Sequence, residues 1–392
     1  MSDIGQYLDK AIAEALPFMV EARRALHAIP ELAFEETRTA EYVADILRKL
    51  GYTPVCGEVG TSVTALLDSG RPGPYIMLRA DMDGLPVSEE TVLPFASTHP
   101  GCMHACGHDG HMAMLLGAAK VLMSIKERLC GKILLLFQPA EEDSGGAAPI
   151  TASGMLDGVD CCLGAHIWPE LPHGLVGVKA GPLMAAVGRF EIDVQGRGGH
   201  SSQPHLCVDA LDVAGQIVTA LRRIPVQQVD PLEPAVLTIG SLQSGTTYNV
   251  IPDTAKILGC VRTYDMDLYL EWGELIAAAA QGVAAAYGAS CTTRFAPGHP
   301  AVINPPDLTA VVRKAAVDAV GVERVVEPEL SLAGEDFSCY QEAMPGCFFF
   351  IGSGQKGGAA LHNPHFDFNE DLLALGPGVF CRAVLALGQK EC

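Results

Sequence analysis

The sequence predicts an α/β protein whose mostly parallel, helix-covered sheet is interrupted by a smaller α+β domain. Three observations lead to this prediction: the length of the chain, an alternation of strands and helices in its first and last parts, and a different order in the middle. The 392 residues exceed what one compact core normally holds, which indicates two domains. Hydrophobic residues make up 49% of the chain, enough to fill large cores.

The first part alternates segments of helical spacing with short apolar runs typical of buried strands. Because these runs are apolar on both faces, we expect helices to cover both sides of a parallel sheet. Gly51 is expected to end the second helix. The expected helices are Ile4–Ile29, Glu36–Leu50 and Gly110–Ile125, and the expected strands are Ser62–Leu67, Tyr75–Ala80, Lys132–Gln138 and Asp160–His166.

After Gly181-Pro182 the order becomes β-α-β-β-α-β, which is typical of a ferredoxin-like domain. We expect this domain, residues 183–296, to be inserted between two parts of the larger one, residues 1–182 and 297–392. A role as a lid or as a dimerisation domain is expected for it. Its elements are expected at Arg189–Gln195, Val208–Ile224, Ala235–Leu242, Ala255–Thr263, Leu268–Tyr287 and Ser290–Phe295, followed in the larger domain by Pro306–Val320, Gly346–Gly352 and Glu370–Leu387.

The charge of the chain argues against several classes of partner. A formal net charge of −20 argues against nucleic acid, since phosphate binding needs clustered Lys and Arg, and it leaves no polybasic patch for a membrane. The longest apolar runs, Ile133–Phe137 and Cys347–Ile351, are too short to span a bilayer. Residues 1–10 lack the apolar core of a signal peptide, so we expect a cytoplasmic protein whose 13 cysteines are mostly reduced.

Four segments concentrate His, Cys and Glu beside glycines or strand ends. Three of them follow or end an expected strand, and open α/β sheets bind ligands at the carboxyl ends of their strands. We therefore expect segments that are distant in sequence to converge. They are Cys106–His111, Pro139–Glu142, Gly164–His166 and Leu361–His365.

Cys106 and His108 are separated by one residue just before an expected helix, so both can face one cation. Asp109 can hold a ligand histidine in orientation. The alternative is an ordinary helix N-terminus with Asp109 as its capping group. His111 is expected to pack or to form a hydrogen bond on the helix.

Glu141 and Glu142 directly follow an apolar strand and Pro139. Burying adjacent carboxylates is unfavourable without a cation or a proton. One carboxylate can bind metal while the other accepts a proton from the attacking water. The alternative is a pair of exposed loop glutamates.

His166 and His362 are each compatible with a hydrogen-bonded structural histidine. In combination, one Cys, three His and one Glu are enough to hold two metal ions, with one Glu left as a base. Two other readings remain: a thiol hydrolase with Cys106 as nucleophile, and a non-catalytic binding protein that kept the fold.

Along nearly its whole length the chain resembles the bacterial N-acyl-amino-acid amidohydrolases, a family that includes hippurate hydrolases and the plant hydrolases of auxin–amino acid conjugates. The resemblance is carried by ordered motifs with family-like separations. They are Arg24-Ala25-Leu26-His27 with Pro30-Glu31, Arg79-Ala80-Asp81-Met82-Asp83, Cys106-Gly107-His108-Asp109-Gly110-His111, Pro139-Ala140-Glu141-Glu142, the His166 segment, Gly199-His200, Asn249-Val250-Ile251-Pro252-Asp253, Gly334-Glu335-Asp336-Phe337 and His362-Asn363-Pro364.

The resemblance implies a role for each matching position. Glu141 would be the general base, and His200 would stabilise the oxyanion in its own or in the partner subunit's active site; a flexible Gly-rich turn explains His200 equally well. Asp81 and Asp83 look structural or supportive of the ligands. The implied metal ligands are Cys106, His108, Glu142, His166 and His362, and the implied substrate contacts are Asn249, Gly334 and Arg262, of which Arg262 is otherwise an ordinary strand-edge charge.

The implied activity is hydrolysis of the amide bond of a small-molecule N-acyl amino acid. The resemblance further implies that water is activated at a centre of two divalent ions per subunit (Zn, Mn, Co or Ni) and that the protein is a homodimer or an oligomer built from dimers. A dipeptidase or carboxypeptidase with the same chemistry is the alternative. The chain departs from the family pattern at Asp143-Ser144, Gly84, Ala165 and Ala210, which leaves the substrate preference open.

Overall fold

The computed structural model describes residues 3–142 and 145–389, so the departure at Asp143-Ser144 lies outside the described residues. The chain divides into two compact units, which are described separately. The larger unit comprises Met1–Leu183, Ile303–Glu329 and Asp336–Cys392, and the smaller one comprises Met184–Val302 and Leu330–Glu335.

An eight-stranded sheet forms the centre of the larger unit, with the order β1-β2-β4-β3-β5-β16-β6-β15. Neighbours in the middle run parallel, from β4 through β3 and β5 to β16, whereas β1–β2, β2–β4 and β6–β16 are antiparallel. The α/β class with a mostly parallel sheet is thus confirmed. The strands are β1 (Val55–Cys56), β2 (Val63–Asp68), β3 (Tyr75–Asp81), β4 (Lys132–Gln138), β5 (Cys161–Pro172), β6 (Val176–Gly177), β15 (Val325–Val326) and β16 (Gly346–Gly354).

The register of the central strands places residues of β3, β4 and β5 that belong to the candidate site at the same height in the sheet. Asp81 pairs with Gln138, and Arg79 pairs with Gly164, so His166 lies level with the carboxyl ends of β3 and β4. The expectation that His166 ends its strand is wrong, because β5 continues to Pro172 beside β16. Two prolines are tolerated there because the pairing becomes irregular between Gly352 and Gly354.

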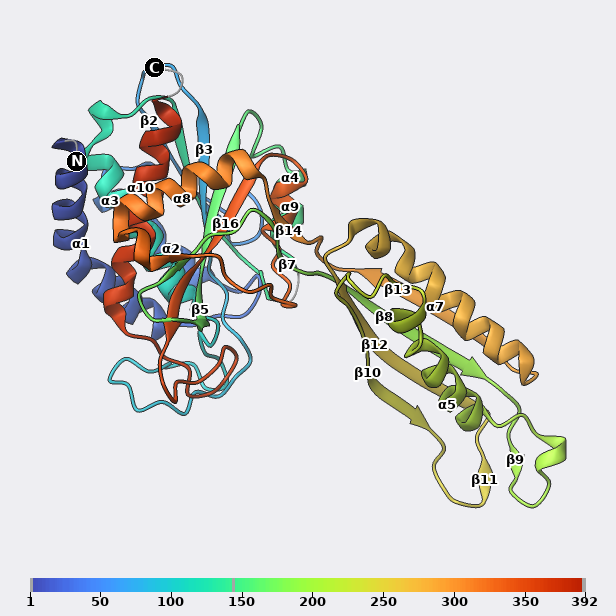
Figure 1. The fold of residues 1–392 in the computed structure, drawn as a ribbon. Coiled ribbons are helices and arrows are strands. Elements are labelled where there is room, and N and C mark those ends of the chain that lie inside the picture. The colour runs from blue at the N-terminus through green and yellow to red at the C-terminus, as the bar shows by residue number, and fades with distance from the viewer. Residues whose placement is uncertain (1–2, 143–144, 390–392) are drawn as a thin grey trace. The chain divides into compact units, whose positions relative to one another are not determined.

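Helices cover both faces of this sheet. Figure 1 shows α1, α3, α8 and α10 gathered on one side of the strands and the short α4 and α9 on the other. Gly51 follows the C-cap residue of α2 and has a positive φ of 92°, as expected for a terminating glycine. The helices are α1 (Asp3–His27), α2 (Thr37–Lys49), α3 (His108–Ser124), η1 (Lys126–Arg128), α4 (Ala147–Ala152), α8 (Pro306–Val320), η3 (Val322–Arg324), α9 (Ser338–Gln341), η4 (Glu370–Ala374) and α10 (Leu375–Gly388).

Alternate residues of the central strands fill the two sides of the sheet. On one side Phe349 meets Phe380 of α10 with ring centroids 5.3 Å apart. On the other side Phe350 stacks on Trp168 at 4.4 Å. This double burial explains why the strands are continuous apolar runs.

One helical segment of the described residues, Glu370–Gly388, is long and apolar enough to cross a membrane by length and composition. Of its most apolar 18-residue stretch, 61% is buried inside the protein. Leu373, Val379 and Phe380 belong to the core of the larger unit, so the segment has the burial of a core helix.

The smaller unit contains a four-stranded antiparallel sheet with the order β10-β12-β8-β13. Figure 1 shows α5 and α7 side by side on one face of this sheet. Trp272 and Ile276 of α7 pack there with Ile217 of α5 and Ile257 of β12. The elements are β8 (Ala186–Gln195), β9 (Gly199–His200), η2 (Pro204–Leu206), α5 (Ala210–Leu221), α6 (Ile224–Gln227), β10 (Ala235–Ser244), β11 (Val250–Ile251), β12 (Thr254–Thr263), α7 (Met266–Ala286) and β13 (Ser290–Pro297), and β7 (Gly181–Met184) pairs with β14 (Val302–Asn304) where the chain passes between the units.

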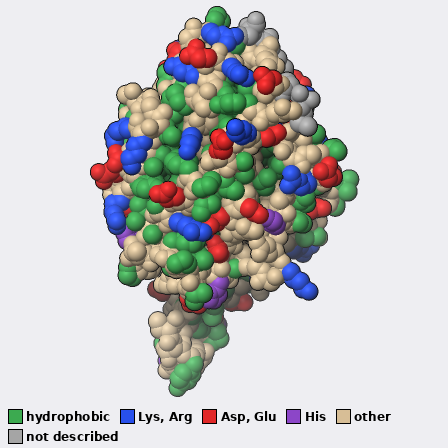
Figure 2. All heavy atoms as spheres, turned by 90° about the vertical axis from the view of Figure 1, so that its left-hand side faces the viewer, with side chains coloured by type: hydrophobic (Ala, Val, Ile, Leu, Met, Phe, Trp, Pro, Cys, Tyr) green, Lys and Arg blue, Asp and Glu red, His purple; other side chains and the backbone are tan. Residues whose placement is uncertain are grey.

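The surface charges and the state of the cysteines can be compared with what the composition predicts. On the face drawn in Figure 2, acidic, basic and apolar side chains are interspersed. Eleven of the described cysteines are free thiols, in line with the expectation of mostly reduced thiols. Cys130 departs from it, because this residue is disulfide-bonded.

Gly117 of α3 provides a test of the helix layer. A Cβ there would lie 2.2 Å from Met19 Sδ and 3.2 Å from Pro377 Cγ, so a methyl group would push against α1 and α10. We predict that Gly117→Ala lowers the free energy of unfolding by about 1–3 kcal/mol, although alanine favours helix. Gly378→Ala in α10 is the matched control, since its Cβ meets only Ala319 at 3.4 Å. Urea unfolding checks both, and an equal effect at the two positions would contradict this packing.

Candidate metal centre

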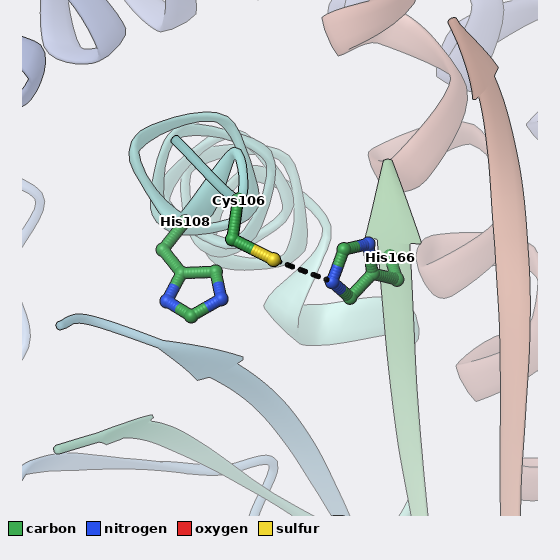
Figure 3. Close-up of side chains that lie close together, drawn as sticks. All are labelled: Cys106, His108 and His166. Carbon is green, nitrogen blue, oxygen red and sulfur yellow. Dashed lines mark hydrogen bonds between the residues drawn. The ribbon is translucent and has the colours of Figure 1, made fainter. Parts of the chain in front are cut away.

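The candidate centre lies at the carboxyl edge of the parallel strands, where α3 begins. Cys106 immediately precedes Gly107, the N-cap residue of α3, whose φ of 86° is in the left-handed region that favours glycine. This turn places Cys106 and His108 around one point. Figure 3 shows the sulfur of Cys106 directed at the ring of His166 on β5, with His108 on the other side of the cysteine.

The ring of His166 is held in one tautomer. Its Nδ1 lies 2.7 Å from the carbonyl oxygen of Ile167, which can only accept, so Nδ1 carries the proton. Nε2 therefore presents a lone pair to Cys106 Sγ at 3.5 Å. A tetrahedral zinc-type ion that binds one thiolate and one imidazole separates the two ligand atoms by about 3.5 Å. Burial and the neighbouring His111 lower the pKa of His166 well below its usual value, which keeps the ring neutral.

His108 is arranged in the same way. Its Nδ1 donates to the carbonyl oxygen of Asp83 at 2.9 Å and also lies 3.2 Å from Asp83 Oδ1. Nε2 is buried and has no hydrogen-bond partner in the part of the chain that the structure describes. It faces Glu142 Oε1 at 3.7 Å, too long for a hydrogen bond but close to the separation of two ligands of one metal ion, about 3.4 Å.

Glu142 and His362 complete the group. His362 Nε2 lies 3.2 Å from Glu142 Oε1. The backbone of His362 has a φ of 63°, and its N–H donates to the carbonyl oxygen of Ala105 at 2.8 Å. This hydrogen bond ties the His362 loop to the residue before Cys106.

Three sets of potential ligand atoms lie within 4.8 Å of one another at this centre. Cys106 belongs to two of the sets and His108 to two, so the sets overlap into one cluster. They are Cys106–His108–His166, Cys106–Glu142–His362 and His108–Glu141–Glu142. The structure therefore brings together the six residues predicted as ligands and base.

Negative charge dominates this cluster. Burial lowers the pKa of His108, but Asp81, Asp83 and Glu142 raise it to about 10. Burial, followed by Glu142 and Glu141, raises the pKa of the Cys106 thiol. Neighbouring carboxylates contribute to both shifts, and their excess of negative charge attracts positive charge. The unpartnered His108 Nε2 and the mixed sulfur, nitrogen and oxygen donors fit a divalent cation such as zinc.

A fourth set, Asp81, His108 and His111, fits a cation less well. His111 Nε2 accepts the N–H of Ile167 at 2.8 Å, so Nδ1 carries the proton and donates to Asp81 Oδ1 at 2.7 Å. Both ring nitrogens are occupied, as expected for a histidine that forms hydrogen bonds on the helix. Asp81 also accepts from Arg79, which supports its prediction as a residue behind the ligands.

Asp109 differs from both expectations. The N-cap of α3 is Gly107, and no side chain caps it, so Asp109 is not the capping group. Its Oδ2 accepts from Arg23 Nε and lies 2.8 Å from His27 Nδ1, rather than contacting a candidate ligand. The residue that orients His108 is Asp83. Asp109 points away from the cluster because a buried arginine and a buried histidine compensate its charge.

Glu141 lies beside Glu142 with 8% of its surface exposed. The N–H of Asp336 donates to Glu141 Oε1 at 3.4 Å. The Asp336 carboxylate in turn accepts from Arg79 and Gln138, both at 2.7 Å. This network attaches the expected base to the end of β4.

The four site residues predicted in the smaller unit fall into two pairs. His200 of β9 is opposite Val250 of β11, next to Asn249. Arg262 is opposite Val187 in the sheet, and a Cβ on Gly334 would also meet Val187. The first pair follows the end of β8 at Gln195 and the second lies near its start at Ala186, so the pairs are about 25 Å apart. The structure does not bring these four residues together within the unit.

Comparison with known proteins identifies the family. The sequence profile of peptidase family M20/M25/M40 matches residues 77–386. The chain belongs to this family. It is 42% identical over 352 residues to N-acetyl-L-cysteine deacetylase of Bacillus subtilis, covering 90% of this chain and 84% of that protein. It is 38% identical over 393 residues to thermostable carboxypeptidase 1 of Saccharolobus solfataricus, covering 98% of each.

A solved structure adds to the family assignment. The Bacillus subtilis YXEP protein, described as a dinuclear metal-binding peptidase from the M20 family, matches with a TM-score of 0.84 and 35% identity over 96% of this chain and 99% of that chain. The M20 chain described here is therefore an enzyme that hydrolyses amide bonds. Its family and this neighbour support divalent metal ions at the centre.

Two supporting residues, Arg23 and Glu36, carried no assigned role in the sequence, whereas Asp83 was expected to be structural or to support the ligands. The i, i+2 spacing of Asp81 and Asp83 at a strand end was a usable signal, since both fall on one face. Arg23 and Glu36 gave no such signal in the sequence, because each resembles an ordinary charged residue near the end of a helix.

His27 makes stability depend on pH. Burial lowers its pKa, but attraction to Asp109 and hydrogen bonds with Asp109 and Glu89 raise it to about 9. A raised pKa stabilises the fold below the unfolded value of about 6.5, and this stabilisation is lost as the pH rises through 9. We predict that His27→Gln is less stable than the wild type by on the order of 2–3 kcal/mol at pH 6, and that the difference shrinks by pH 9.5. Urea unfolding at both values tests this, with exposed His365→Gln as control; a difference independent of pH would contradict the assignment.

Proposed function

We propose that this M20 chain hydrolyses the amide bond of N-acyl amino acids, using two divalent ions held by Cys106, His108, Glu142, His166 and His362. The observation that carries the proposal is the fixed tautomer of both buried histidines. In each, Nδ1 donates its proton to a carbonyl oxygen, so that Nε2 is directed at the other ligands. A divalent cation can bind both Nε2 atoms and balance the neighbouring thiolate and carboxylate.

The overlap of the ligand sets supports two ions that would be held by these residues together. Sulfur, imidazole and carboxylate donors suit Zn, Co or Ni, and Mn is the least favoured by the thiolate. Bound divalent ions would polarise the acyl carbonyl and lower the pKa of the attacking water.

Glu141 transfers the proton of the attacking water to the leaving nitrogen. It lies beside Glu142, and the Asp336 N–H holds its carboxylate in place. Glu141 accepts a proton from the attacking water while the water oxygen bonds to the acyl carbon. The C–N bond then breaks, and Glu141 gives the proton to the leaving nitrogen. The products are a carboxylic acid and a free amino acid.

His200 supplies a hydrogen bond to the developing oxyanion, and its distance from Arg262 supports action between subunits. An N-acyl amino acid cannot span the 25 Å or so between the His200–Asn249 pair and the Arg262–Gly334 pair. We propose that the smaller unit forms a homodimer contact and closes over substrate, so that Arg262 and Gly334 serve their own subunit and His200 and Asn249 serve the partner.

Two alternatives differ in their support. A carboxypeptidase is favoured by the thermostable carboxypeptidase relative, which matches the whole chain. A thiol hydrolase needs a thiolate of lowered pKa, whereas burial raises the pKa of Cys106. A hydrolysis screen that compares acetyl-, benzoyl- and longer-acyl amino acids with dipeptides decides between the proposed N-acyl amino acid hydrolase and the carboxypeptidase. Activity on free dipeptides alone would overturn the proposed substrate class.

Glu141→Gln tests the base. The substitution keeps the size of the side chain and removes its proton acceptor, so we predict unchanged metal content and a loss of kcat of at least about 10²-fold. Glu142→Gln should lose metal instead, and exposed Glu170→Gln should change neither. Metal analysis and steady-state kinetics measure both properties, and an active, metal-replete Glu141→Gln would refute the assignment.

Subunit mixing tests action between subunits. His200→Ala and Glu141→Gln should each be inactive alone. After subunit exchange, the mixed dimer has one site with both residues, so about a quarter of wild-type activity should return. Absence of recovery, with exchange proven by native mass spectrometry, would show that His200 acts within its own subunit.

A further inference from the structure

The turn before Glu141 and Glu142 has an unfavourable backbone. Ala140 has a φ of 58°, in the left-handed region that L-residues other than glycine rarely adopt. Among residues 3–142 and 145–389, only Phe34, Ala140 and His362 share this feature without being glycine. Such a conformation persists only where surrounding contacts impose it.

The turn has a geometric purpose. Successive residues of an extended strand point to opposite faces, so Glu141 and Glu142 could not both face one cluster if β4 simply continued. β4 ends at Gln138, and the turn at Ala140 follows. A carboxylate oxygen of each glutamate then lies within 4.8 Å of a His108 ring nitrogen.

Glu36 is the side chain that holds this turn. Its carboxylate is fully buried. Oε1 accepts the N–H of Ala140 at 2.9 Å, and Oε2 accepts the hydroxyl of Thr61 at 2.5 Å. Burying a carboxylate is unfavourable. We therefore expect the hydrogen bond that Glu36 accepts from the Ala140 N–H to serve a function at the site.

Glu36 is not used for helix capping, although it occupies the N-cap position of α2. The free N–H groups of that helix are served by Glu31, which accepts from Arg38 N at 3.2 Å and from Thr39 N at 2.9 Å. Glu36 is therefore directed away from its own helix and toward the Glu141–Glu142 turn.

We propose that Glu36 is a positioning residue that locks Ala140 in the left-handed conformation, so that Glu141 and Glu142 both face the candidate metal ligands. It touches neither substrate nor metal and acts through the backbone of Ala140. The inference rests on the metal site of the proposed function, and only its consequence for turnover rests on the proposed hydrolysis of N-acyl amino acids.

The test uses Co²⁺ affinity, measured by absorption of the bound ion in competition with a chelator, together with kcat and KM. We expect Glu36→Ala to weaken Co²⁺ binding by about 10–100-fold, as is typical when a partner behind a ligand is removed. We expect kcat to fall by at least about tenfold with a smaller change in KM. Glu36→Gln should stay within about threefold of the wild type, because its amide oxygen still accepts from Ala140.

Recovery of Co²⁺ affinity by a second substitution distinguishes a positioning role of Glu36 from a purely structural one. Glycine adopts a positive φ freely, so Ala140→Gly in the Glu36→Ala background should recover about threefold or more of the lost Co²⁺ affinity. Thr61→Val is the matched control, because it removes the other donor to Glu36 and leaves the Ala140 contact; it should lower Tm and leave Co²⁺ affinity nearly unchanged. If Glu36→Ala does not fold, Glu36→Asp, which withdraws the carboxylate, takes its place in the same scheme.

The outcomes divide cleanly. A folded Glu36→Ala with wild-type Co²⁺ affinity, or a loss that Ala140→Gly does not reduce, overturns the inference. A wild-type protein that hydrolyses no N-acyl amino acid but shows the Glu36-dependent Co²⁺ affinity overturns the proposed function and supports the inference.

Discussion

Buried negative charge at one edge of the large sheet is the constraint on which the site depends. Asp81, Asp83, Glu141 and Glu142 meet there, and desolvated carboxylates are unfavourable without compensating cations or donors. Arg79 compensates Asp81 and Asp336. Glu142 lies close to Cys106, His108 and His362, and a divalent cation is the natural complement of this group. The same reasoning explains Asp109, whose charge Arg23 and His27 already balance.

Backbone groups give the centre its rigidity. The carbonyl oxygens of Asp83 and Ile167 fix the proton of each buried histidine, and a carbonyl cannot exchange donor and acceptor roles. Left-handed residues Gly107, Ala140 and His362 turn the chain where a regular helix or strand would carry the ligands apart. Of the three described non-glycine residues with a positive φ, Ala140 and His362 lie next to or within the candidate ligand set, a placement that is common in active sites.

The sequence predicted most of the larger fold because the central strands are buried on both faces and the helices are long and periodic. Short elements such as β6, β15 and α9 carry too few residues for a periodic signal, and the antiparallel edges depend on long-range pairing that periodicity does not encode. β5 continues beyond its expected end at His166 because irregular pairing with β16 tolerates Pro169 and Pro172.

At the site, the six residues that carry distinctive chemistry were predictable, because Cys, His and paired Glu beside strand ends are uncommon. Among the residues that hold them, Asp81 and Asp83 were expected behind the ligands, but Arg23 and Glu36 were not predicted. Arg23 and Glu36 are ordinary charged residues in sequence, and only the fold shows that they are buried against an opposite charge and a turn. Asp109 was misassigned because its partners, Arg23 and His27, are more than 80 residues away in the chain. Gly107 was needed for its positive φ, which the motif alone does not reveal.

The central claim is that Cys106, His108, Glu142, His166 and His362 hold two divalent ions while His111 and Asp81 stand behind them. Anomalous X-ray diffraction from crystals loaded with zinc, recorded on both sides of the zinc absorption edge, tests it most directly. The account predicts two anomalous peaks per subunit, with Nε2 of His108 and of His166 and the sulfur of Cys106 at about 2.0–2.3 Å from a peak. Peaks ligated by His111, or no peak beside Cys106, would contradict it.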